Sequence, residues 1–145
     1  MRRHKYRADT NVLNRTLGRV SDLSATQQQV FSNQIRTSFE RIKNGQPEPD
    51  DFNLLATSLN VLMVRSEAIH ESCVAIVVNA MVALERCRQR FNQNGQWGFD
   101  GPSLQDMNEA MDLQDEILSK STPAQMFNAL KVSGQRVQKL CAAAH

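Results

Sequence analysis

A chain of 145 residues is long enough to bury a hydrophobic core and most often folds as one domain. Its apolar content of 41% and charged content of 22% are typical of a globular protein, and a net charge of only +2 excludes the strongly positive overall field of a dedicated nucleic-acid-binding protein. Three cysteines without a CxxC motif indicate a reducing compartment. The most apolar segment, residues 73–84, is too short for a membrane span. We therefore expect a cytoplasmic protein that does not cross a membrane.

Residues 1–8 show no helical periodicity and carry many like charges, which predicts a flexible basic arm. Within residues 1–20, six bases stand against one acid. Basic side chains interleaved with an aromatic one suit contacts with the phosphates of a nucleic acid and stacking on its nucleobases. If the arm binds nucleic acid, the residues that make the contacts are Arg2, Arg3, Lys5, Tyr6 and Arg7. A solubilising tail without a ligand is the alternative.

Capping signals and helical periodicity predict a helical domain over residues 9–141, followed by a frayed tail over residues 142–145. A short helix directly follows the arm. Ser24 and Gln27 form a capping box that opens the second helix, which ends before Gly45. The apolar stripe of this second helix consists of Phe31, Ile35, Phe39 and Ile42.

The next helical stretch contains neither Gly nor Pro between residues 50 and 93. One helix over that span would be about 64 Å long, which is too long for a domain of this size. We therefore predict a break between Ala68 and Ser72, with one long bent helix as the alternative. Residues 72–84 are apolar nearly all round, so they are expected to form the most buried helix. If the other helices do not cover this segment, a symmetric homodimer would.

Two further helices are predicted in the last third of the chain. A loop from Gly95 to Pro102 precedes a helix capped by Ser103, and Thr122 with Gln125 caps the last helix. No segment shows the alternation of a strand. The sequence therefore predicts an all-α fold, a single compact domain of five to six helices in an orthogonal or bundle-like arrangement.

One spacing is reminiscent of a metal centre. Glu67 and His70 have the Glu-x-x-His spacing of carboxylate-bridged di-iron bundles, which need two such motifs and two further glutamates. Of the three histidines, His4 and His145 lie at the chain ends. A polar kink of the chain is the favoured interpretation of the Glu67–His70 spacing. A cysteine nucleophile is not predicted either, because no recognisable motif positions a histidine base beside a cysteine. We predict no catalytic residue, no metal and no cofactor.

Two surfaces are candidates for binding a protein partner. Residues 100–116 carry six acids and no base, of which the candidates are Asp106, Glu109, Asp112, Asp115 and Glu116. A solvated helix face is the alternative for them. Trp97 and Phe99 lie between glycines, either as an anchor for a partner or as a plug at the end of the core. Arg86, Arg88 and Arg90 could extend a basic surface or simply complement a helix C-terminus.

Several short phrases resemble small uncharacterised proteins encoded in proteobacterial prophages and related mobile elements. These phrases are Asp51-Phe-Asn-Leu-Leu-Ala56, Val64-Arg-Ser-Glu-Ala-Ile69, Trp97-Gly-Phe-Asp-Gly-Pro102 and Ser121-Thr-Pro-Ala-Gln125, together with the basic start Met1-Arg-Arg-His-Lys-Tyr6. The resemblance implies a phage-encoded accessory protein in a bacterial cytoplasm, and it transfers no site residues. Such proteins often act by binding a host protein and blocking or redirecting it.

These observations favour a non-catalytic protein–protein interaction or accessory protein that binds a host or phage protein. The alternative is a small nucleic-acid-binding regulatory protein that uses the basic arm.

Overall fold

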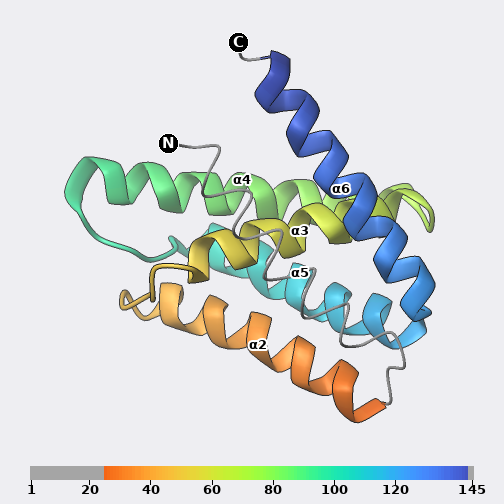
Figure 1. Cartoon of the computed structure of the whole chain (residues 1–145). Coiled ribbons are helices and arrows are strands. Elements are labelled where there is room, and N and C mark those ends of the chain that lie inside the picture. Colours follow the sequence, from red (N-terminus) through yellow and green to blue (C-terminus); the bar gives the residue numbers. More distant parts are fainter. Residues whose placement is uncertain (1–24, 144–145) are drawn as a thin grey trace.

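A computed structural model of the chain describes residues 25–143, which form five helices and no strand (Figure 1). The helices are α2 (Ala25–Lys43), α3 (Asp51–Glu67), α4 (Glu71–Asn94), α5 (Gly101–Lys120) and α6 (Pro123–Ala143). The prediction of an all-α fold is confirmed. The basic arm, the short helix after it, the cap at Ser24 and the burial of Phe31 lie outside what the structure describes.

The corner between α2 and α3 is built around a buried carboxylate. Asp51, the first residue of α3, accepts hydrogen bonds from the Ser38 hydroxyl at 2.9 Å, from the Glu48 backbone N–H at 2.8 Å and from Arg41 Nη1 at 3.3 Å. Asp51 therefore ties the last turns of α2 to the loop and to the start of α3. Within α2, Ile35, Phe39 and Ile42 are buried as the stripe predicts.

The break predicted between Ala68 and Ser72 is confirmed, because α3 ends at Glu67 and α4 begins at Glu71. His70 between them is extended, and its ring Nδ1 accepts a hydrogen bond from the Ser72 backbone N–H at 3.0 Å. The histidine therefore acts as the N-cap of α4. At the other end of α4, Gly95 has the left-handed φ of 72° that favours glycine, and its N–H donates to the Phe91 carbonyl.

Helix α3 is the centre of the packing, since the other four helices described all contact it. Leu55 and Leu59 on α3 are completely buried, and Val61 and Leu62 nearly so. Helix α6 packs almost entirely on α3, and its C-terminal half extends away from the rest of the molecule (Figure 1).

The prediction that residues 72–84 form the most buried helix is wrong. Helix α4 lies along one edge of the molecule and packs mainly on α3 and α5 (Figure 1). Only one stripe, Val77, Ala80, Ala83, Leu84 and Cys87, reaches the core. The opposite side contains Val78 and Val82, which are 43% and 54% exposed. Because the segment has no charged side chains, its sequence predicts burial on every side of the helix. In the structure, the other described helices cover only one side of it.

The first turn of α5 also differs from the prediction. The helix begins at Gly101, and its N-cap is Asp100, whose carboxylate accepts a hydrogen bond from the Ser103 backbone N–H at 2.8 Å. Ser103 is thus the donor to the cap and not the cap itself. The predicted capping box of the last helix is confirmed, because Gln125 Oε1 accepts from the Thr122 backbone N–H at 2.9 Å and Thr122 Oγ1 accepts from the Gln125 backbone N–H at 3.2 Å.

We predict that Asp51→Ala lowers the free energy of unfolding by about 2 kcal/mol, because it leaves the buried Ser38 hydroxyl and the Glu48 N–H without their acceptor. Urea denaturation followed by circular dichroism measures the change. Asp50→Ala is the matched control, since Asp50 is exposed and its side chain makes no cap hydrogen bond. Equal losses in the two variants would contradict the role given to Asp51.

Candidate interaction surface

The acids of α5 are partly engaged within the fold. Asp115 accepts hydrogen bonds from the Ser32 hydroxyl and from Arg36 Nε, the latter at 3.0 Å, and Arg36 Nη2 lies 3.2 Å from Asp112. The bond to Asp115 is the main cause that raises the pKa of the Arg36 guanidinium. These contacts join α2 to α5, so Asp112 and Asp115 have a structural role.

The remaining acids are dispersed along α5. Glu116 pairs with Lys120 at 2.7 Å, and this bond lowers the pKa of the Glu116 carboxyl. Glu109 is exposed and Asp106 is half-buried. The five acids proposed from the sequence therefore do not form one unpaired acidic patch.

Glu67 and His70, the spacing reminiscent of a di-iron site, are used in other ways. The Glu67 carboxylate pairs with Arg136 of α6, and the His70 ring caps α4. Within residues 25–143, no group of three or more His, Cys, Asp or Glu side chains could hold a metal ion.

Trp97 and Phe99 lie against the end of the core. The Trp97 ring stacks on Phe91, with centroids 4.2 Å apart and planes at 12°, and its centroid is 5.6 Å from that of Phe52. Phe99 lies 5.6 Å from Phe39 on α2. Both side chains are half-buried and pack against the core cluster. Their arrangement fits a plug between the ends of α2, α3 and α4 better than an anchor for a partner.

Two of the three arginines at the end of α4 are paired locally. Arg86 lies 2.9 Å from Asp100, and Arg88 pairs with Glu85 one turn earlier. The pKa of the Asp100 carboxyl is lowered, first by the Ser103 backbone N–H and to a smaller extent by Arg86. The arm residues Arg2, Arg3, Lys5, Tyr6 and Arg7 lie outside the described residues, so nucleic-acid binding by the arm stays a prediction.

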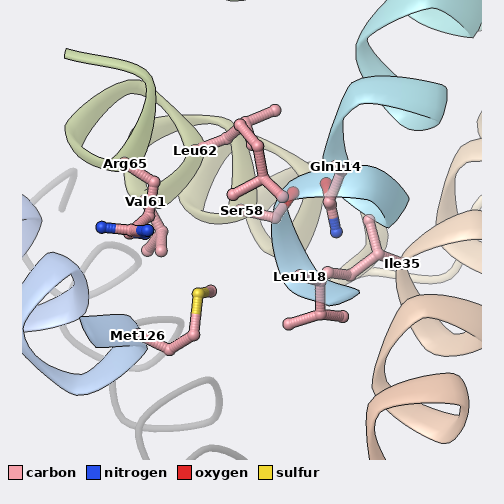
Figure 2. A pocket seen from close by; sticks show the side chains of 9 residues that line it. Ile35, Ser58, Val61, Leu62, Arg65, Gln114, Leu118 and Met126 are labelled. Atoms are coloured by element: carbon pink, nitrogen blue, oxygen red, sulfur yellow. The ribbon is translucent and has the colours of Figure 1, made fainter. Parts of the chain in front are cut away.

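A small cavity lies among α2, α3, α5 and α6 (Figure 2). Its walls are mainly apolar, and Ser58, Arg65 and Gln114 are its polar members. The Gln114 side chain is buried, and its Oε1 atom has no hydrogen-bond partner. The cavity has a volume of about 20 Å³. That is room for about one water molecule, so this cavity is not a substrate pocket.

The outer side of α4 is the most unusual surface among the described residues. We call it the α4 face and define it by exposed Ala75, Val78, Asn79 and Val82 with half-exposed Val74. No charged residue occurs from Ser72 to Leu84, which is more than three helical turns. A surface helix normally carries charged or polar side chains on its outer side. The sequence signal for this surface is the missing charge, which is also what a buried helix shows.

No protein-family model, curated protein or solved structure matches this chain. Among the helices described, none is long and apolar enough to span a membrane. Function is therefore inferred from the surfaces of residues 25–143.

We predict that Gln114→Met raises the free energy of unfolding by about 1 kcal/mol, because a side chain of similar length replaces a buried acceptor that has no partner. Chemical denaturation measures the change, and Gln105→Met, at an exposed position of the same helix, is the control. A loss of stability specific to Gln114→Met would show that the Gln114 amide makes a favourable interaction in solution.

We predict that Cys87 reacts with a thiol reagent about tenfold more slowly than the half-buried Cys73 and Cys141 in the native protein at pH 8. Burial is the main cause that raises the pKa of the Cys87 thiol, so less of the reactive thiolate is present. Ellman's reagent, applied to the Cys73→Ser/Cys141→Ser variant, isolates Cys87. Rapid reaction of that variant in its folded state would contradict the prediction, and rapid reaction in denaturant is the positive control.

Proposed function

We propose that the protein is a non-catalytic protein-binding protein and that it binds through the α4 face. The observation that carries the proposal is that Val78 and Val82 are exposed on a helix without charge from Ser72 to Leu84. Clustered apolar side chains on a soluble domain mark surfaces that other molecules cover.

The acids of α5 and the Trp97 loop do not belong to the proposed binding surface. Asp112, Asp115 and Glu116 already have partners of opposite charge. Trp97 already stacks on Phe91. Truncating these side chains would remove contacts within the fold, whereas the side chains of the α4 face have much of their surface still to bury.

The α4 face is also suited to binding because it is rigid. The inner stripe of α4 holds the helix on α3 and α5 through Val77, Leu84 and Cys87, all buried. A preformed helix face loses little conformational entropy on association. Removing the apolar surface of this face from water favours association.

The resemblance to prophage-encoded proteins supports a biological setting for this activity. In that setting the chain would be a phage-encoded regulatory or accessory protein in a bacterial cytoplasm. Its partner would then be a host or phage protein.

We predict that Val82→Glu abolishes protein binding, because it places a charge within the apolar surface. Tagged protein is immobilised and exposed to a bacterial lysate that also contains the untagged chain, and retained proteins are quantified by mass spectrometry. Val30→Glu on α2 is the matched control, since Val30 is 53% exposed and Val82 is 54% exposed.

At least one protein should be retained by the wild type and by Val30→Glu but not by Val82→Glu. Circular dichroism checks that both variants are folded. A set of retained proteins that does not depend on Val82 would refute the proposed function.

A further inference from the structure

We propose that the α4 face binds the α4 face of a second copy of this chain, with the two helices antiparallel. This inference rests on the proposed function, because it names the partner of the same surface. The two-fold axis would pass between Val78 and Val82, at the level of Ala80.

The spacing of the outward residues fits helix pairing. Six positions on this side of α4 recur alternately at intervals of four and three: Glu71, Ala75, Val78, Val82, Glu85 and Gln89. This is the a/d pattern that forms the seam between two helices in a coiled coil. The opposite stripe, which includes Val77, Ala80 and Cys87, faces the core of its own chain. Helix α4 can therefore pack on both sides at once.

The charges at the two ends of the seam select the antiparallel arrangement. A parallel pair would set Glu71 against Glu71 and Glu85 against Glu85 of the second copy. An antiparallel pair around the proposed axis instead sets Glu71 opposite Gln89 and Glu85 opposite Ala75. It also brings Glu71 within about one turn of Arg86 and Arg90 of the second copy. Antiparallel helix dipoles add to this preference.

The centre of the seam is apolar and self-complementary in the same register. Val78 of one copy lies opposite Val82 of the other, and the two-fold symmetry produces this contact twice. Small and β-branched side chains at Ala75, Val78 and Val82 let the helix axes approach to about 8–9 Å. Two exposed apolar residues elsewhere have polar or charged neighbours along the chain: Val30 on α2 lies between Gln29 and the Asn33-Gln34 pair, and Leu140 on α6 follows Lys139.

The size of the contact is that of a weak complex. Helix α4 has 24 residues. At 1.5 Å per residue it is about 36 Å long, and two such faces about 10 Å wide bury roughly 700 Å² in total. Stable complexes usually bury at least about 1,200 Å². The dimer is therefore expected to be weak and reversible.

Sedimentation equilibrium of the full chain between about 1 and about 200 µM tests the dimer. The wild type and Val30→Glu should shift from monomer to dimer over this range. Val82→Glu should raise the dissociation constant at least about tenfold, because the two-fold axis places a carboxylate in each of the two apolar Val78–Val82 contacts. A wild type that stays monomeric throughout, or a Val82→Glu variant that dimerises like the wild type, would overturn the proposal.

Mixing charged variants tests the register. Val78→Lys and Val82→Glu should each dimerise only weakly alone and should form a heterodimer when mixed, because position 78 faces position 82 of the other copy. A mixture of Val82→Lys and Val82→Glu should form less heterodimer, since position 82 of one copy lies about 6 Å along the helix axis from position 82 of the other. Stronger recovery in the second mixture would show a parallel pair and overturn the antiparallel arrangement.

The outcomes separate this inference from the proposed function. A monomeric wild type that still retains a lysate protein through Val82 would refute the dimer alone. A monomeric wild type with no Val82-dependent partner would refute both.

Discussion

The burial of α3 is the constraint on which the rest of the structure depends. Leu55 and Leu59 are completely buried, and each of the other four described helices contacts α3. Shortening either leucine to alanine leaves a cavity in the core, which costs about 2–5 kcal/mol. The polar groups around α3 fix its ends. Asp51 holds the α2 corner, and His70 caps the helix that follows the break. These two contacts help to fix where α2 and α4 lie relative to α3.

Local signals in the sequence predicted the helices well, because capping and helix breaking involve residues a few positions apart. The break before Glu71 and the Thr122–Gln125 box were predicted from such spacing and are present. The predicted N-cap of α5 was wrong by three residues, since the carboxylate of Asp100 takes the capping role predicted for Ser103. Both residues are good caps by type, and the choice between them depends on how the Trp97 loop enters the helix.

The candidate surfaces were harder to predict, because exposure depends on contacts between distant residues. Asp115 and Arg36 are 79 residues apart, and no local pattern pairs them. The uncharged stretch of α4 was visible in the sequence, but hydrophobicity alone does not distinguish a helix covered by its own chain from one covered by another molecule. Only the positions of α3 and α5 show that one side of α4 is left open.

The attachment of α6 has a consequence for the dynamics of the fold. Because α6 packs almost entirely on α3 and its far half extends away from the other helices, few contacts hold its last turns (Figure 1). Regions with few buried contacts open at a lower free energy than the whole domain unfolds. Backbone amides near Leu140 should therefore exchange their hydrogens by local opening, while those around Leu59 exchange only when the entire core comes apart. The single chain thus contains a stable central unit and a terminal helix whose outer turns open independently of it.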